Sequence, residues 1–412
     1  MERSAGWPAD GRRTAVVSLS LSEFRNYRAL RLETDERPVV LTGPNGAGKT
    51  NLLEAVSLLT PGKGLRSARL GEILRRTGGR TDRDASAPAP PASNAVTTWA
   101  VAGQIATAEG VVEVGTGLAA DGAAKGRDRR VVRVDGTPVR SQADLASILS
   151  AVWLTPRMDL LFSDSTSTRR RFLDRLVFSL DPAHARRVGS YEHTLRERTR
   201  VLRGGGGAAG RGPKADGHWL NVLEDSMATT GVAIAAARRE IAGRLNRIDA
   251  TQHAGAFPSV EMIPTGAVEE WLDLGPALDA EDKLRVELRE SRRRDAEVGG
   301  AAVGPHRSDV KIIHGPSGLA AEQCSTGEQK ALLISAILSL ARLQAAERGS
   351  VPILLLDEIA ARLDEERRRA LFENIAALGA QAWLTGTDES VFAPLGAAAQ
   401  FFRVEDATVT PW

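Results

Sequence analysis

The stretch from Val39 to Glu54, VVLTGPNGAGKTNLLE, constrains the fold of this 412-residue chain more than any other. It opens with a short apolar run that is typical of a buried strand, and Leu52, Leu53 and Val56 then follow at helical spacing. The glycine-rich segment between them has the Walker A spacing, which suits a phosphate bound at a helix N-terminus. The sequence therefore predicts a nucleotide site in a loop that joins a strand to a helix.

Each residue type in this loop has an expected role. The glycines permit backbone dihedral angles that are closed to residues with a Cβ atom, so that successive N–H groups can surround a phosphate. Lys49 is expected to reach the outer phosphates of ATP, and Thr50 to bind Mg²⁺ through its hydroxyl. A chance glycine-rich turn is the alternative, which the flanking strand and helix disfavour. The predicted ATP-binding residues here are Gly43, Pro44, Asn45, Gly46, Ala47, Gly48, Lys49 and Thr50.

A second apolar run, from Ile353 to Glu358, matches a Walker B strand. Such a strand places a carboxylate at the C-terminal edge of a parallel sheet, where ligands bind in these folds. Asp357 is expected to hold Mg²⁺ and Glu358 to orient or deprotonate the attacking water, so Lys49, Asp357 and Glu358 are the predicted catalytic residues. In isolation, this run would more often be a buried strand that ends in an acidic turn.

The segment from Cys324 to Gln329, CSTGEQ, opens a predicted helix shortly before Walker B. A serine and a glycine at a helix N-terminus can bind an anion, although Ser325 and a glutamate three residues later also form an ordinary capping box. The position between the two Walker motifs resembles the signature motif of the ATP-binding-cassette (ABC) superfamily, and Asp364 matches the D-loop. This resemblance implies that Ser325, Gly327 and Asp364 complete the ATP site of a second subunit.

Composition limits the remaining possibilities. Hydrophobic residues make up 42% of the chain, which suffices for a sizeable core, and the longest apolar stretch is about half of what a bilayer span needs. We therefore expect a soluble, cytoplasmic protein without a membrane partner. The single cysteine excludes an internal disulfide framework and agrees with a reducing compartment. The net charge of +2 does not by itself indicate nucleic-acid binding.

The other patterns divide the chain into a nucleotide-binding part and a helical part. Alternating segments predict strands at 15–21, 29–33, 96–103, 110–117 and 130–134, with a hairpin turn at Asp135 and Gly136. Helical spacing predicts helices at 172–180, 219–248 and 281–297, and strand patterns return at 309–313 and 352–356.

The predicted fold is α/β: a P-loop ABC-type ATPase head with an antiparallel β subregion and an inserted α-helical domain. The head is split in sequence into residues 15–164 and 298–412, and the helical insert comprises residues 165–297. Residues 1–14 are expected to be a flexible tail. The segment 77–93, which is rich in Gly, Pro, Ala and Ser, is expected to be a disordered loop.

An ordered set of short motifs runs through nearly the whole chain. They are FRNY at 24–27, GPNGAGKTNLLEAV at 43–56, GLRS at 64–67, RVDG at 133–136, RRRFLD at 169–174, GPHRSD at 304–309 and CSTGEQK at 324–330. This set resembles the RecF family of bacterial recombination mediators, which is related to the SMC ATPases. By this resemblance, Arg25 and Asn26 of the first motif are expected to contact the nucleotide.

The same resemblance implies a function. It indicates an ATP- and Mg²⁺-dependent homodimer that binds single-stranded DNA and gapped or junction duplex DNA. It also implies that the protein promotes RecA loading with RecO and RecR in recombinational repair, replication restart and SOS induction. ATP hydrolysis would be weak and DNA-stimulated, and would act as a molecular switch.

A basic helical region offers a DNA surface independently of the resemblance. Arg169, Arg170, Arg171 and Arg175 could neutralise duplex phosphates without reading bases. A solvated helix face with charges balanced by acidic residues is an equally good interpretation. The sensor of the γ-phosphate is also open, because no histidine follows the strand at 382–385 and Thr387 or Asp388 lies in that neighbourhood.

Two other classes of protein stay possible. An ABC-type subunit of a transporter is disfavoured, because the insert before the signature is far longer than a coupling-helix domain. In a P-loop kinase or metabolic NTPase, Ser325 and Asp364 would be ordinary helix caps. ATP-induced dimerisation and the response of ATP hydrolysis to DNA distinguish these classes.

Overall fold

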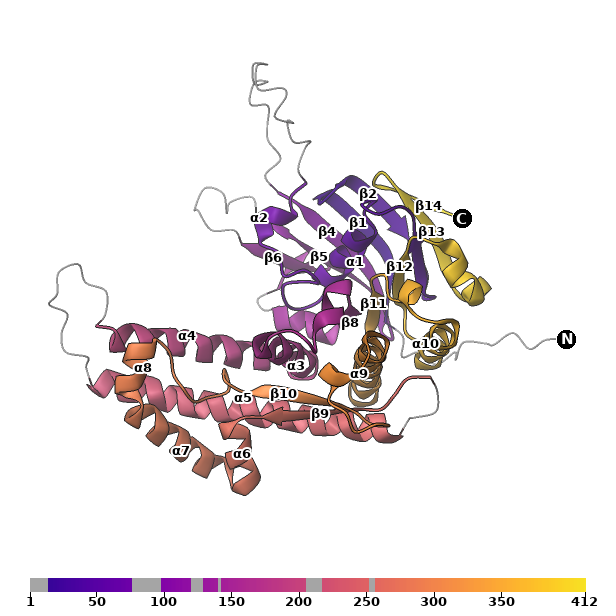
Figure 1. Cartoon of the computed structure of the whole chain (residues 1–412). Coiled ribbons are helices and arrows are strands. Elements are labelled where there is room, and N and C mark those ends of the chain that lie inside the picture. Colours follow the sequence, from indigo (N-terminus) through magenta and orange to yellow (C-terminus); the bar gives the residue numbers. More distant parts are fainter. Residues whose placement is uncertain (1–13, 76–97, 120–128, 140–141, 205–216, 252–255) are drawn as a thin grey trace, which may run out of the picture. The chain divides into compact units, whose positions relative to one another are not determined.

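The computed structural model of the chain describes residues 14–75, 98–119, 129–139, 142–204, 217–251 and 256–412 (Figure 1). The chain forms two compact units. Unit 1 comprises Met1–Pro156 and Gln344–Trp412, and unit 2 comprises Arg157–Leu343. The predicted flexible tail, apart from Thr14, and the predicted loop at 77–93 lie outside the described residues.

The first sheet of unit 1 is mostly parallel and contains both Walker strands. Its order is β14-β13-β3-β12-β11-β8, and only the β13–β14 pair is antiparallel. Every residue of β3, β11 and β12 is buried, as expected for apolar runs in a parallel sheet. The strands span β3 (Val39–Thr42), β8 (Ala151–Leu154), β11 (Ile353–Leu356), β12 (Ala382–Gly386), β13 (Gln400–Glu405) and β14 (Thr408–Pro411).

The second sheet of unit 1 is antiparallel, which confirms the predicted β subregion. Its order is β2-β1-β4-β5-β6-β7. Asp135 and Gly136 form the hairpin turn between β6 and β7, and their φ angles of 47° and 74° are those of the expected turn type. The strands span β1 (Ala15–Phe24), β2 (Tyr27–Glu33), β4 (Ala100–Thr107), β5 (Gly110–Leu118), β6 (Arg130–Val134) and β7 (Thr137–Pro138).

One apolar core joins the two sheets of unit 1. It includes Leu19 of β1, Leu52 of the helix after the Walker A loop, and Trp383 of β12, all fully buried. The core therefore fixes the Walker A loop between the two sheets. The helices of this unit are α1 (Lys49–Leu58), α2 (Leu70–Ile73), α10 (Glu365–Leu378), and the short η2 (Gln142–Ser147), η5 (Ala360–Arg362) and η6 (Glu389–Ala398).

Unit 2 consists mainly of helices around the long helix α5 (Figure 1). Its core includes Tyr191, Met227, Leu284 and Leu288, which come from α4, α5 and α7. Helix α9 begins in this unit and ends in unit 1. The elements are η3 (Pro156–Leu160), α3 (Thr166–Leu180), α4 (His184–Leu202), α5 (Gly217–Thr251), β9 (Val260–Thr265), α6 (Ala267–Leu274), α7 (Ala277–Glu290), α8 (Arg292–Val298), β10 (Asp309–His314), η4 (Ala321–Gln323) and α9 (Thr326–Arg348).

Two features of unit 2 differ from the sequence-based expectations. The helix predicted at 281–297 is broken at Ser291 into α7 and α8, and the Leu288 carbonyl accepts hydrogen bonds from Arg198 (2.5 Å) and Ser291 (3.4 Å). The strand β9 was not expected in the helical insert, and it pairs with β10. Strand β10 lies in unit 2 together with the rest of residues 298–343, whereas the expected boundary assigned these residues to the head.

Among the described residues, no helix combines the length and the apolar character that crossing a membrane requires.

Candidate nucleotide site

The Walker A loop contains two glycines at which a Cβ atom would be strained and would collide with neighbouring atoms. Gly43 and Gly48 have φ angles of 141° and 119°. A Cβ atom on Gly48 would lie 2.6 Å from Asn26 Nδ2 and from the hydroxyl of Tyr27. The Tyr27 hydroxyl is buried and has no hydrogen-bond partner among the described residues, so Tyr27 supports the loop by packing alone. The motif FRNY is therefore part of the frame of the loop.

Lys49 lies inside the loop. Its Nζ atom donates hydrogen bonds to the carbonyls of Gly43 (2.7 Å) and Pro44 (2.9 Å). Burial lowers the pKa of Lys49, and the nearby carboxylates of Glu358 and Asp357 oppose that shift. The residue borders a pocket of about 220 Å³ that is lined by Asn45, Gly46, Gly48, Lys49, Thr50, Asn51, Arg66 and Glu358.

The two predicted Mg²⁺ ligands lie in direct contact. The Thr50 hydroxyl is 2.9 Å from Asp357 Oδ1 and 3.1 Å from Oδ2. They meet because α1 begins beside the C-terminal end of β11. A hydroxyl and a carboxylate at the edge of a phosphate-binding loop fit Mg²⁺, which takes one or two protein oxygens and fills its other positions with phosphate and water. The residues present therefore match the ion that the motif implies.

Thr385, which the sequence analysis did not identify, connects the Asp357 carboxylate to the backbone of Glu358. Its hydroxyl donates to Asp357 Oδ1 (2.8 Å) and accepts from the backbone N–H of Glu358 (2.8 Å). Glu358 has a φ angle of 54°, a conformation that costs energy in a residue with a side chain. Asp388, one of the two residues expected in this neighbourhood, instead caps η6 by accepting from the Ser390 N–H (2.9 Å).

Arg25 and Asn26 support the loop from the FRNY turn. Arg25 makes a bidentate ion pair with the buried carboxylate of Glu54, at 2.5 and 2.8 Å. Asn26 donates to the Ala47 carbonyl at 3.0 Å. Both side chains are thus engaged with the frame of the site, and their contact with a nucleotide stays a prediction.

Arg66 is a second residue that the sequence analysis did not assign. It donates to Glu54 Oε2 (2.9 Å) and to Asn51 Oδ1 (2.6 Å), and it lines the same pocket as Lys49. Its motif, GLRS, lies in a loop after α1 and has no local pattern that indicates a phosphate ligand. Glu54, on the same helix as Lys49, was the sequence signal that could have indicated Arg66, because a buried carboxylate needs a basic partner.

Ser325 and Asp364 both form helix caps. The Ser325 hydroxyl accepts from the N–H of Glu328 (3.3 Å), and the Ser325 N–H donates to the Glu328 carboxylate (2.8 Å), as in a capping box. Asp364 accepts from the N–H of Arg367 (2.8 Å) and caps α10. Ser325, Gly327 and Asp364 are all solvent-exposed. Ser325 and Asp364 therefore cap their helices, as the alternative interpretation predicted. All three residues are nevertheless accessible to another molecule.

Comparisons of this chain with known proteins show the family to which it belongs. Residues 15–410 match the family described as RecF/RecN/SMC N terminal domain. The DNA replication and repair protein RecF of Rhizobium rhizogenes is 46% identical to this chain over 396 residues, which cover 96% of this chain and 98% of that protein.

The chain belongs to the RecF family.

Other RecF proteins and solved structures agree with this assignment. RecF of Agrobacterium fabrum is 44% identical and covers 97% of this chain, with 99% of that protein matched. The solved structure described as the recombination mediator protein RecF-ATPrS in the RecFOR pathway has a TM-score of 0.77, with 21% identity, 97% of this chain and 98% of that chain covered. This likeness confirms the predicted fold class. An SMC head domain from Pyrococcus furiosus has a TM-score of 0.50 at 15% identity.

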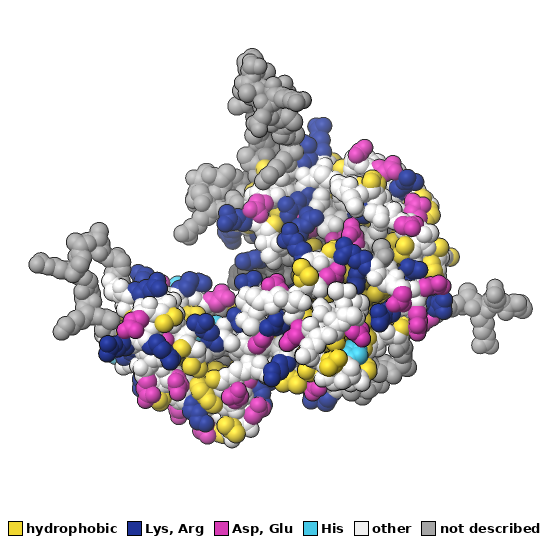
Figure 2. Space-filling view, in the orientation of Figure 1, with side chains coloured by type: hydrophobic (Ala, Val, Ile, Leu, Met, Phe, Trp, Pro, Cys, Tyr) yellow, Lys and Arg dark blue, Asp and Glu magenta, His cyan; other side chains and the backbone are white. Residues whose placement is uncertain are grey.

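The four arginines predicted to contact DNA in this RecF-family chain have different surroundings. Arg169 makes a bidentate ion pair with Asp309, at 2.6 and 2.9 Å. Arg175 lies 5.5 Å from the centre of the Phe172 ring. Arg170 donates to the Ser308 carbonyl (2.7 Å), and Arg171 is exposed. Acidic and basic side chains are mixed over the end of unit 2 that carries α6, α7 and α8 (Figure 2).

Proposed function

We propose that the protein is an ATP-dependent, DNA-binding recombination mediator. ATP binds at the Walker A loop and joins two copies into a homodimer, which binds single-stranded DNA and gapped or junction duplex DNA. With RecO and RecR it promotes RecA loading in recombinational repair, replication restart and SOS induction. The contact of Thr50 with Asp357 supports this proposal most directly, because it brings the two predicted Mg²⁺ ligands together in a RecF-family chain.

The residues around the loop have separate roles in this proposal. The loop N–H groups and Lys49 bind the phosphates, and Thr50 and Asp357 hold Mg²⁺. When bound, Mg²⁺ neutralises phosphate charge and orients the outer phosphates. Glu358 orients the attacking water and accepts its proton. Thr385 keeps the Glu358 backbone and the Asp357 carboxylate in position through its two hydrogen bonds.

The proposed dimer explains why the signature residues are exposed. Ser325, Gly327 and Asp364 lie at accessible helix N-termini, where N–H groups and a hydroxyl can approach an anion. We propose that Ser325 and Gly327 contact the outer phosphate of the ATP held by the other copy, and that Asp364 helps to complete the same site. A site completed only in the dimer makes hydrolysis slow in the monomer, so the protein is a weak ATPase that DNA stimulates by favouring the dimer.

ATPase and sedimentation measurements with and without gapped DNA test this function. The proposal predicts ATP-dependent dimers and a hydrolysis rate that rises when gapped DNA is added. A rate that does not respond to DNA, combined with co-purification of a membrane protein, would instead indicate a transporter subunit. Rapid hydrolysis by a monomer would indicate a metabolic NTPase.

A further inference from the structure

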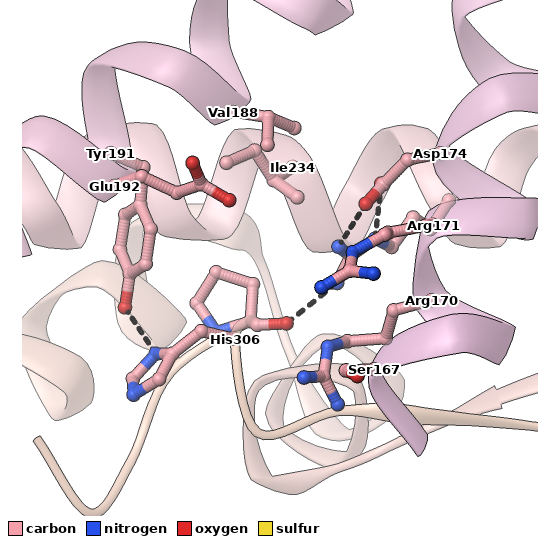
Figure 3. A pocket seen from close by; sticks show the side chains of 11 residues that line it. Ser167, Arg170, Arg171, Asp174, Val188, Tyr191, Glu192, Ile234 and His306 are labelled. Carbon is pink, nitrogen blue, oxygen red and sulfur yellow. Dashed lines mark hydrogen bonds and ion pairs between the residues drawn. The ribbon is translucent and has the colours of Figure 1, made fainter. Parts of the chain in front are cut away.

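Unit 2 contains a pocket of about 120 Å³ between α3, α4, α5 and the segment 305–306 (Figure 3). Three arginines line it, Arg170 and Arg171 of α3 and Arg238 of α5. We call it the arginine pocket. In Figure 3 the side chains of Arg170 and Arg171 lie on the side of the pocket opposite Tyr191 and His306. The nucleotide site does not include any of these residues.

All three guanidinium nitrogen atoms of Arg238 donate hydrogen bonds within unit 2. It makes a bidentate ion pair with Asp174, at 2.8 Å for both bonds, and donates to the Pro305 carbonyl at 2.7 Å. Asp174 also contacts His184 Nε2 at 2.8 Å. Burial alone would raise the pKa of Asp174, but the hydrogen bonds from His184 and Arg238 lower it to about 2. This carboxylate therefore neutralises Arg238 and is not available to the other two arginines.

Arg170 and Arg171 retain free donors. Arg170 uses Nη1 on the Ser308 carbonyl (2.7 Å) and on Thr166 (3.3 Å), and its Nε and Nη2 have no acceptor within the described parts of the chain. Arg171 makes no hydrogen bond or ion pair with any residue that the structure describes. Burial lowers the pKa of Arg170, the positive charges of Arg238 and Arg171 act in the same direction, and the carboxylates of Asp309 and Asp174 oppose the shift. The lining thus carries three arginines against the two carboxylates of Asp174 and Glu192, which leaves an excess of positive charge.

The opposite wall does not neutralise this excess. His306 accepts from the Tyr191 hydroxyl (2.9 Å) and donates to the Ala301 carbonyl (3.0 Å), and burial lowers its pKa to about 4. It is therefore neutral at physiological pH. Glu192 also lines the pocket, but its carboxylate is largely exposed and lies 3.9 Å from Arg196.

Ser167 adds a hydroxyl and a helix terminus. It is the second residue of α3, so it lies in the first turn of a 15-residue helix, where the helix dipole favours a negative charge. Its hydroxyl lies 2.9 Å from that of Ser165, the N-cap residue. The pocket therefore combines two forked cationic donors, a hydroxyl and a positive helix end.

We propose that the arginine pocket binds a phosphate group through Arg170, Arg171 and Ser167, and that this group is a backbone phosphate of DNA. The identification of the phosphate as part of DNA rests on the proposed DNA-binding function. Free phosphate has the same chemistry and could bind in the same way. Arginine forks suit phosphate because each presents two parallel donors. Contacts of this kind position DNA without reading its sequence. Arg169 and Arg175 are not ligands in this account.

Two kinds of variant test the pocket. Ser167→Asp places a carboxylate beside the arginines at a position where the helix dipole favours it, so the fold is preserved. Ser167→Asn is its neutral control. The double variant Arg170→Ala/Arg171→Ala removes both guanidinium groups that have free donors. The double variant Arg293→Ala/Arg294→Ala removes two exposed charges from α8 and is the charge-matched control.

The measurement is duplex DNA affinity at several salt concentrations. We expect Ser167→Asp and the Arg170/Arg171 double variant to bind about 10- to 100-fold more weakly, as for loss of charge-assisted hydrogen bonds. The logarithmic salt slope should fall by about 1, because one phosphate is released. The Ser167→Asn and α8 variants should keep most of the affinity, and the α8 variant should keep the slope.

Thermal unfolding in inorganic phosphate at constant ionic strength distinguishes the two sources. If duplex DNA binds the wild type and the pocket variants with the same salt slope, the phosphate in the pocket does not come from DNA. The proposed DNA-binding function would still hold in that case. If phosphate also protects wild type and Ser167→Asp equally, the pocket itself is refuted. No DNA binding by the wild type would contradict the proposed function, and phosphate protection then decides the pocket alone.

Discussion

The Thr385 hydroxyl donates a 2.8 Å hydrogen bond to Asp357, and the same oxygen accepts from the N–H of Glu358. One side chain on β12 thus holds the Asp357 carboxylate and the Glu358 backbone, which both follow β11. Thr385 is fully buried, so no solvent can replace these hydrogen bonds. We infer its role from its position beside the proposed Mg²⁺ ligand and the proposed general base.

Replacing Thr385 with valine keeps the shape of the side chain and removes both hydrogen bonds. We expect the kcat for ATP hydrolysis to fall about 10- to 100-fold, as for other residues that orient a metal ligand. Nucleotide affinity should change less, because Lys49 and the loop N–H groups are untouched. Thr385→Ser retains the hydroxyl and should restore most of the rate. Equal loss of kcat in both variants would show that packing, not hydrogen bonding, accounts for the effect.

Measuring nucleotide binding distinguishes the proposed role of Lys49 from that of Glu358. Lys49→Ala should abolish ATP binding, because the loop loses its cation. Glu358→Gln should preserve binding and trap an ATP-bound dimer, because only the base is lost. Equilibrium binding of a fluorescent ATP analogue and sedimentation check both outcomes. Similar loss of binding in the two variants would contradict the assigned roles.

Asp174 stabilises unit 2 through Arg238. Because its pKa in the folded state is lowered to about 2, its contribution of about 2 kcal/mol is present above about pH 4 and is lost as the pH falls toward 2. Asp174→Asn leaves Arg238 buried without a counter-charge and should cost about 3–5 kcal/mol at neutral pH. Urea unfolding between pH 7 and pH 3 measures both effects.

Asp225→Asn is the matched control for that experiment. Asp225 pairs with Arg285 at 2.7 Å but is 51% exposed, so its loss should cost about 0–1 kcal/mol. The difference between the wild type and Asp174→Asn should shrink as the pH falls below about 4. A difference that stays constant over this range would mean that Asp174 acts through packing alone.

Local pattern was enough to predict the elements that carry the nucleotide site. The apolar runs at Val39 and Ile353 became neighbours of β12 in one parallel sheet, and the hairpin at Asp135 formed where the turn residues indicated it. These predictions depended on residues close together in sequence. The fold class was confirmed for the same reason.

Contacts between distant segments could not be predicted in this way. Thr385 meets Asp357 because β12 lies beside β11, and no local pattern specifies strand order. The pairing of Arg66 and Arg25 with Glu54 depends in the same way on the packing of separate loops against α1. The strand β9 was missed because its pairing partner, β10, lies more than 40 residues further along the chain.

The central claim is that Ser325 completes the ATP site of a second copy. Its most direct test is sedimentation of Ser325→Arg in the Glu358→Gln background, with ATP and Mg²⁺. Ser190→Arg, which changes an exposed serine on α4, is the matched control. The account predicts that the Ser190 variant dimerises and that the Ser325 variant stays monomeric while still binding ATP. An ATP-dependent dimer of the Ser325 variant, as stable as that of the control, would contradict it.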